Sequence, residues 1–236
     1  MKSHSLSAKG IAFLISIIIQ VVSAQAQAGT NPGRTGWWNF NNTVDLLAPV
    51  PGYGLPLILT GDHQQVEGPA VNDYAVKIGT GSYYKMIHQI PANGGGNYVN
   101  EYTLQVDFKV ESINVWHCFF QTNTQNANDG DCFINPQGRI GVGATGYSSS
   151  ALEANEWYRL VVSVDNSKAY NYYIDGFQIL TGIPQTIDDR FSLEEVLLMF
   201  ADNDGEDNAI IVSEIAIWDC PLSESEVSEL GGFGHA

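Results

Sequence analysis

The chain has 236 residues, of which 10 are basic and 26 acidic, so its formal net charge is −16, and 44% of its residues are hydrophobic. An acidic surface of this kind repels phosphate backbones and anionic lipids, which argues against nucleic acids and anionic membranes as partners. The length and apolar content are typical of a single domain with a sizeable core. Half of the acidic residues lie between Asp188 and Glu229, so we expect the negative potential to concentrate there.

The N-terminal segment has the organisation of a signal peptide. Two lysines precede or flank an apolar run over residues 11–22, and small residues follow it up to Ala28. We predict a signal peptide over residues 1–28, cleaved after Ala26 or Ala28, and one domain over residues 29–236. Because the apolar run is too short to span a bilayer comfortably, we expect no membrane insertion and a secreted, periplasmic or cell-surface location.

Strand patterns dominate the rest of the chain. Residues 101–110 alternate strictly between apolar and polar side chains, which predicts a half-buried strand. Asp175-Gly176 predicts the tight turn of a hairpin over residues 169–181. Many short strands with Gly and Asn in their connections predict a sandwich or barrel. The further predicted strands are 37–41, 74–78, 83–88, 115–120, 132–134, 139–143, 157–165, 169–174, 177–181, 196–200 and 209–218.

One helix is predicted, at the C-terminus over residues 222–231. Ser223 followed by Glu226 three positions later forms a capping box, and Gly231 supplies the left-handed stop. The helix is short, and helical periodicity is nearly absent elsewhere in the sequence.

Three cysteines are present, in a chain expected to enter an oxidising compartment. Cys118 and Cys132 lie in two short apolar segments on either side of a polar stretch, so we predict a cross-strand disulfide between them. Such a bridge would stabilise the fold by roughly 3 kcal/mol. We expect Cys220 to be a free thiol, and none of the three has the spacing of a metal site.

Several short sequence motifs, taken in their order along the chain, resemble one family. They are Gly-Trp-Trp-Asn-Phe at 36–40, the strand at 101–110, Asn-Glu-Trp-Tyr-Arg-Leu-Val at 155–161, Tyr-Ile-Asp-Gly at 173–176 and Val-Ser-Glu-Ile-Ala-Ile-Trp at 212–218. Together they are similar to the laminin-G-like and concanavalin A-like jelly-roll domains of exported bacterial proteins. The resemblance implies an all-β, antiparallel jelly-roll β-sandwich. It leaves function open, because the fold hosts lectins, glycosidases, lyases and protein-binding modules.

An acidic run at residues 202–208 is the main candidate for a metal site. Carboxylates at Asp202, Asp204 and Glu206 offer the hard oxygen ligands that calcium prefers. The resemblance also favours a structural calcium ion, since such domains often hold one at a loop rim. The alternative is an acidic turn whose side chains bond to their own backbone. The polar run at 126–131 is interpreted as the tip of a hairpin, with a supply of further ligands as the alternative.

Two kinds of enzyme with this fold would need particular residue patterns. A glycoside hydrolase of this fold needs paired carboxylates alternating on one strand face, and the sequence contains no such pattern. A polysaccharide lyase needs a Tyr or His base beside a charge neutraliser, and Tyr84 and His88 are expected to share one strand face. The arginine-rich strand that would accompany them is missing. Catalysis therefore stays an alternative.

Binding is the function that the sequence favours. Tyrosines and tryptophans exceed what a core of this size needs, and aromatic faces with Asn and Asp beside them suit a carbohydrate. Tyr147, in an unpatterned loop, is the first candidate contact residue, with Tyr84 and His88 as further candidates. We predict an extracytoplasmic, non-catalytic recognition module for a glycan or a surface protein, with a structural calcium. The alternatives are a polysaccharide lyase and a protein-binding adhesion or envelope scaffold.

Overall fold

The structure, a computed structural model, describes residues 33–234. The predicted signal peptide and its cleavage site lie outside these residues. Within the described part of the chain, no helix is long and apolar enough to cross a membrane.

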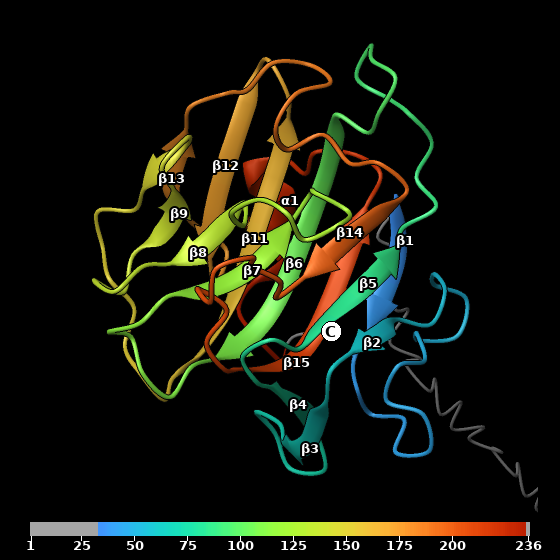
Figure 1. The fold of residues 1–236 in the computed structure, drawn as a ribbon, viewed down its shortest axis with the longest axis vertical. Helices are drawn as coiled ribbons and strands as arrows, with labels where there is room; N and C mark the ends of the chain where they lie inside the picture. Colours follow the sequence, from blue (N-terminus) through green and yellow to red (C-terminus); the bar gives the residue numbers. More distant parts are fainter. Residues whose placement is uncertain (1–32, 235–236) are drawn as a thin grey trace, which may run out of the picture. The chain divides into compact units, whose positions relative to one another are not determined.

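Two antiparallel sheets pack face to face (Figure 1). The larger sheet has the strand order β13-β12-β11-β6-β15-β4-β3, with β1 also paired to β15; its strands are β1 (Arg34–Trp38), β3 (His63–Glu67), β4 (Tyr74–Ile78), β6 (Glu101–Lys109), β11 (Trp157–Asp165), β12 (Ala169–Ile174), β13 (Phe177–Gly182) and β15 (Ile210–Trp218). The smaller sheet has the order β10-β9-β8-β7-β14-β5-β2; its strands are β2 (Ile58–Thr60), β5 (Tyr83–Ile87), β7 (His117–Gln121), β8 (Cys132–Ile134), β9 (Ile140–Val142), β10 (Gly146–Tyr147) and β14 (Val196–Met199). The predicted jelly-roll sandwich is confirmed.

The core lies between the two sheets. The alternation of β6 places Leu104, Val106 and Phe108 in it, each almost fully buried. The ring of Phe108 meets Phe119 of β7 edge-on, with 4.7 Å between the ring centroids, and so joins the two layers. Each large apolar side chain buried in this way stabilises the fold by about 1.5–3 kcal/mol.

The C-terminal helix α1 (Glu224–Leu230) lies behind the larger sheet (Figure 1). Its capping box is present as predicted: the Ser223 hydroxyl accepts from the Glu226 amide, and the Glu226 carboxylate accepts from the Ser223 amide. Gly231 caps the C-terminus with a φ of 64°. Val227 is buried in a second apolar cluster with Trp218 of β15, so the helix covers part of the outer face of this sheet.

A buried ion pair lies on the same outer face. Arg159 of β11 donates from Nε and Nη2 to the two carboxylate oxygens of Asp107 on β6, at 2.7 Å each. It also donates from Nη1 to the carbonyl of Leu230 at 2.8 Å, which ties the end of α1 to the sheet. Glu214 of β15 lies 3.4 Å from Arg159 Nη2. The network therefore holds three strands and the helix together.

The N-terminal strands differ from the prediction. β1 begins three residues before the predicted start at Trp37, and β2 and β3 were not predicted. β3 reads His-Gln-Gln-Val-Glu, lies at the edge of the sheet and has no buried residue, so no apolar alternation marks it. An edge strand pairs through its backbone on one side and needs no buried face.

The predicted disulfide is wrong. Cys118 and Cys132 are both buried free thiols. The register of β7 and β8 sets Cys118 opposite Phe133 and Cys132 opposite Phe120, with a β-bulge between Cys118 and Phe120. The Cys118 thiol instead donates to the carbonyl of Ala201 at 3.0 Å. Cys220 is also free, as predicted.

Candidate functional site

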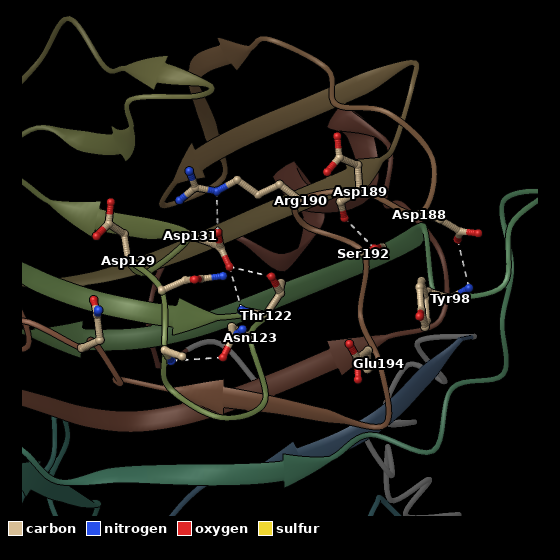
Figure 2. A pocket seen from close by; sticks show the side chains of 13 residues that line it. Tyr98, Thr122, Asn123, Asp129, Asp131, Asp188, Asp189, Arg190, Ser192 and Glu194 are labelled. Carbon is tan, nitrogen blue, oxygen red and sulfur yellow. Dashed lines mark hydrogen bonds and ion pairs between the residues drawn. The ribbon is translucent and has the colours of Figure 1, made fainter.

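Four connections converge on a polar hollow of about 620 Å³, here called the first hollow (Figure 2). They join β5 to β6, β7 to β8, β13 to β14, and β14 to β15, the last of which contributes Asn203. The described residues lining it are mostly amides, hydroxyls and carboxylates: Tyr98, Thr122, Asn123, Ala127, Asn128, Asp129, Asp131, Asp188, Asp189, Arg190, Ser192, Glu194 and Asn203. Its volume is within the usual range of small-ligand sites, about 300–1,000 Å³.

An ion pair crosses the first hollow. Arg190 donates from Nε to Asp131 Oδ1 at 2.8 Å and from Nη2 to the carbonyl of Gly130 at 2.9 Å. The other oxygen of Asp131 accepts from the amide and the hydroxyl of Thr122 at 2.6 and 2.7 Å. Burial raises the pKa of Asp131, while Thr122 and Arg190 act in the opposite direction. Asp131 is therefore a fixed anchor for Arg190, which remains partly exposed to the hollow.

Asp188 ties the β5–β6 connection to the β13–β14 connection. Its carboxylate accepts from the amides of Asn97 and Tyr98 at 2.7 and 3.0 Å, and from the side chains of Asn97 and Asn100 at 2.9 Å each. These bonds stabilise the ionised carboxylate, led by the one from Asn100, and lower the pKa of Asp188 to about 2. Tyr98 is thereby held at the rim with 41% of its surface exposed.

A smaller hollow of about 370 Å³, here called the second hollow, adjoins the first and shares Tyr98 and Glu194 with it. His88 lies in its wall, hydrogen bonded through Nε2 to the carbonyl of Glu194, while its Nδ1 accepts from the amide of Ile90 at 3.1 Å. Burial lowers the pKa of His88. The remaining described residues of the lining are Gln89, Ala92, Asn97, Val99, Leu193 and Glu195.

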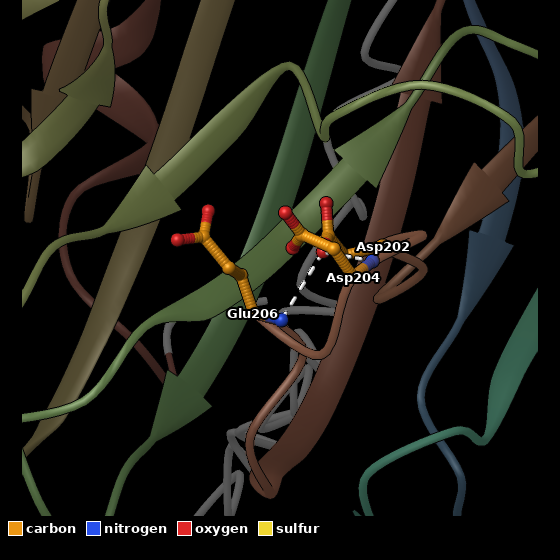
Figure 3. A group of neighbouring side chains, drawn as sticks. All are labelled: Asp202, Asp204 and Glu206. Atoms are coloured by element: carbon orange, nitrogen blue, oxygen red, sulfur yellow. Dashed lines mark hydrogen bonds between the residues drawn. The ribbon is translucent and has the colours of Figure 1, made fainter.

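The predicted metal-ligating residues form an acidic cluster in the connection after β14 (Figure 3). One carboxylate oxygen from each of Asp202, Asp204 and Glu206 lies within 4.8 Å of the others. Asp202 Oδ2 accepts from the amides of Asp204 and Glu206 at 3.1 Å, so the turn curls around this carboxylate. The neighbouring Asp202 carboxylate raises the pKa of Asp204. Burial raises the pKa of Glu206, and the charges of Asp204 and Asp202 raise it further.

The acidic cluster and the first hollow are connected. Asp202 Oδ1 accepts from the amide of Gly130 at 3.0 Å, and its carbonyl accepts from the side chain of Asn126 at 3.2 Å. Asn203, the next residue, lines the hollow. The polar run at 126–131, interpreted from sequence as a hairpin tip, thus lies against the acidic cluster. The structure unites two segments that the sequence offered as separate candidates.

The three predicted ligand-binding residues have different positions. Tyr84 is fully buried in the core, where its hydroxyl meets His63 Nδ1 at 2.6 Å, so its assignment as a surface contact is wrong. His88 is buried but lies in the wall of the second hollow. Tyr147 lies outside both hollows, in β10 with its ring 6.4 Å from Trp116. Burial raises the pKa of Tyr147, and the negative charge of Glu206 adds to the rise.

The ion pair between Asp131 and Arg190, and the role of Asp188 beside it, were not predicted from the sequence. Asp131 was grouped with a polar turn, and Asp188 and Arg190 follow a strand with no motif around them. Their one signal is local: Asp-Asp-Arg at 188–190 places the only arginine of the segment 181–236 beside two acids. The partner of Arg190 is 59 residues away in the chain, so the sequence alone does not reveal the pair.

The family is decided by a match over most of the described chain. Residues 80–228 match the Laminin_G_3 family of the concanavalin A-like lectin/glucanases superfamily. The chain belongs to this superfamily. The match extends from β5 to α1, and so includes both hollows and the acidic cluster. Among curated protein sequences, none matches this chain significantly.

Solved structures share the fold of this superfamily member. Domain 4 of AbnA, an extracellular arabinanase from Geobacillus stearothermophilus solved in complex with arabinotriose, has a TM-score of 0.61 at 20% identity, over 84% of this chain and 98% of that one. The receptor-binding domain of botulinum neurotoxin C/D mosaic serotype has a TM-score of 0.61 at 14% identity, over 84% of this chain and 50% of that one. A botulinum neurotoxin DC binding domain in complex with rat synaptotagmin II has a TM-score of 0.61 at 13% identity, over 84% and 51%. At these identities the likeness concerns the fold.

Proposed function

We propose that the protein is a secreted, non-catalytic carbohydrate-binding module whose ligand occupies the first hollow. The observation that carries this proposal is the lining itself. A guanidinium held by Asp131, amides at Asn123 and Asn128, and a partly exposed Tyr98 surround one concave site. Sugars are recognised by such groups, because planar polar side chains bond pairs of hydroxyls and an aromatic ring packs on the apolar face of a sugar.

The charge of the first hollow favours a neutral sugar over an acidic one. Among its described lining residues, Arg190 is the one cation, and Asp131 already pairs with it. Four further carboxylates face the same space, from Asp129, Asp188, Asp189 and Glu194. A uronate or sialate would meet net repulsion there. The lyase alternative depended on Tyr84 or His88 as a base. Tyr84 is buried in the core, and both ring nitrogens of His88 bond backbone groups, so neither supports that alternative.

The structural neighbours support a binding function in two ways. Domain 4 of AbnA was solved with arabinotriose, and the chain spans 98% of that domain. The neurotoxin domains belong to longer receptor-binding chains, of which this chain spans half. We favour a glycan over a protein surface for this chain, because the first hollow is concave and rich in hydrogen-bonding groups.

The proposal includes a calcium ion held by Asp202, Asp204 and Glu206. The donor set suits calcium: hard carboxylate oxygens converge within 4.8 Å, and Asp129 adds negative charge nearby, contributing to the raised pKa of both Asp204 and Glu206. Three carboxylates at this spacing repel one another, and a divalent cation would relieve that repulsion. Since Asp202 also bonds Gly130, the ion would stabilise the β7–β8 connection that lines the first hollow.

A panel of neutral and acidic polysaccharides tests the proposal by affinity electrophoresis and calorimetry, with calcium present. Ala127→Trp fills the first hollow, and Ala151→Trp places the same side chain at an exposed position outside it. The wild type and Ala151→Trp should bind at least one neutral polysaccharide, while Ala127→Trp loses at least about tenfold in affinity. Absence of binding across the panel, or equal binding by Ala127→Trp, would contradict the proposal.

A further inference from the structure

We infer that the ligand is a linear chain of neutral sugars that passes over Tyr98, with one sugar unit in the first hollow and its neighbour in the second. This inference rests on the proposed function and goes beyond it, because it assigns two subsites and selects internal segments of a glycan chain rather than single terminal sugars.

The two hollows share part of their walls. Tyr98 and Glu194 belong to the walls of both. The segments that carry these residues are locked together by a β-bridge, in which Val99 and Leu193 exchange amide-to-carbonyl hydrogen bonds of 3.0 and 2.9 Å. The bridge lies beside the shared wall, so the spacing of the two hollows is fixed by backbone bonds. A ligand that entered both would therefore meet a preformed surface.

Tyr98 is fixed through its backbone on both sides. Its amide donates to Asp188 Oδ1 at 3.0 Å, and its carbonyl accepts from the amide of Asn93 at 3.1 Å and the side chain of Asn100 at 3.2 Å. The residue is left 41% exposed at the boundary between the hollows. Because its backbone is already fixed, only its side chain has to be ordered on binding, which lowers the entropic cost of stacking a sugar on the ring.

The two hollows differ in chemistry in a way that suits consecutive sugars. The first presents charged and amide groups, which bond hydroxyls. The floor of the second includes Ile90, Val99 and Leu193, all nearly fully buried, with Ala92 at its rim. A sugar ring has hydroxyls around its edge and carbon-bound hydrogens on its faces, so one unit can be anchored by its edge while the next packs on this apolar floor.

The size of the second hollow is compatible with this assignment. At about 370 Å³ it lies at the lower end of the range for small-ligand sites, and the first hollow is larger. His88 cannot serve as a second polar anchor there, because both of its ring nitrogens already bond backbone groups of Glu194 and Ile90. The second hollow should therefore add affinity through packing more than through hydroxyl recognition.

The test is affinity as a function of chain length, measured by calorimetry with arabino-, xylo- and cello-oligosaccharides from the monosaccharide to the hexasaccharide. Ala92→Trp fills the second hollow, and Ala127→Trp fills the first with the same side chain. For the series that binds, wild-type affinity should rise by at least about tenfold, or ~1.4 kcal/mol, between one unit and the longer chains. Ala92→Trp should abolish this rise and keep the affinity for the single unit, whereas Ala127→Trp should lose both.

The outcomes separate this inference from the proposed function. Affinity that does not change with chain length, or a full rise retained by Ala92→Trp, would overturn the two-subsite inference and leave the first hollow as a single-sugar site. Absence of binding to every series at every length would overturn the proposed function, and the inference with it. The melting temperatures of Ala92→Trp and Ala127→Trp check that both variants fold. Tyr98→Ala, which adds no bulk, should also reduce the increase of affinity with chain length.

Discussion

Asn100 and Asp188 form a reciprocal pair. The amide of Asp188 donates to Asn100 Oδ1 at 2.9 Å, and Asn100 Nδ2 donates to Asp188 Oδ1 at the same distance. Asn100 is fully buried and also accepts from the side chain of Asn166 at 3.1 Å. The pair therefore joins the two loops that flank the shared wall of the hollows, across 88 residues of the chain, and adds to the bridge between Val99 and Leu193.

The pair predicts a pH-dependent contribution to stability. Because the pKa of Asp188 is lowered to about 2 in the folded state, against about 3.9 for an unperturbed aspartate, its contribution is complete above pH ~4 and is lost as the pH falls towards 2. Asp188→Asn should be less stable than the wild type at neutral pH, since an amide places donors against the amides of Asn97 and Tyr98. Urea unfolding from pH 7 to pH 2 should show this difference shrinking only below pH ~4. Asp189→Asn removes a charge at the next position and serves as the control. If the difference in stability between the wild type and Asp188→Asn did not change with pH, the ionised carboxylate of Asp188 would not be its source.

The buried ion pair predicts a large and asymmetric cost of mutation. Arg159→Met leaves the Asp107 carboxylate buried without its main partner, so we expect a loss of about 3–5 kcal/mol in the free energy of unfolding. Replacing both residues by apolar ones, as in Arg159→Met with Asp107→Leu, should recover much of that loss. Lys168→Met, which breaks a surface pair with Asp165, should cost less than ~1 kcal/mol. Equal costs for the buried and surface substitutions, measured by denaturant titration, would contradict this interpretation.

The acidic cluster predicts a calcium-dependent melting temperature. At a concentration of about a hundred times its dissociation constant, a bound ion adds about 2.7 kcal/mol, which should raise the midpoint by about 5–10 °C relative to EDTA. Asp204→Asn should abolish the shift. In EDTA at neutral pH, the same variant should be at least as stable as the wild type, because it removes the repulsion that raises the pKa of Asp204.

A matched control makes the calcium test specific. Glu156→Gln removes an exposed acid from the connection before β11, outside the cluster, and should keep the full shift. If magnesium at the same concentration gave an equal shift, the cluster would be a general divalent site rather than a calcium site. A midpoint that calcium does not move would show that the carboxylates form a solvated turn.

The free thiols predict a simple chemical result. Alkylation in denaturant without reductant should modify all three cysteines, and reductant should leave the melting temperature unchanged. Alkylation of the folded protein should be slow at Cys118 and Cys132, because burial raises the pKa of both thiols and keeps them protonated. Cys220, which is partly exposed, should react first. Modification of a single cysteine in denaturant would instead indicate a disulfide.

The sequence predicted the sandwich well because its strands carry local signals. The alternation of β6, the Asp175-Gly176 turn and the capping box at Ser223 each depend on neighbouring residues, and all three are present in the structure. The edge strand β3 lacked such a signal. The Cys118–Cys132 bridge failed because the register of β7 against β8 sets each cysteine opposite a phenylalanine, which spacing along the chain cannot show.

The site was only partly predictable for the same reason. The acidic cluster lies within five consecutive residues, so the sequence found it. The first hollow is made from four separate connections, and its main ion pair joins Asp131 to Arg190 across the fold. Tyr84 was misplaced because a strand's alternation gives two faces without saying which one is buried. Tyr98, the aromatic residue at the rim, stood out only as one of many tyrosines.

Chemical-shift mapping is the most direct test of the central claim, that a neutral glycan binds in the first hollow, where the four connections converge. The ¹⁵N-labelled protein would be titrated with the neutral oligosaccharide of highest affinity, in calcium. We predict that the largest amide shifts cluster at Tyr98, at Thr122–Asp131 and at Arg190–Glu194, with small shifts at β10 and at α1. Shifts concentrated on the outer face of the larger sheet or around Tyr147, with none at Tyr98 and Arg190, would contradict the claim.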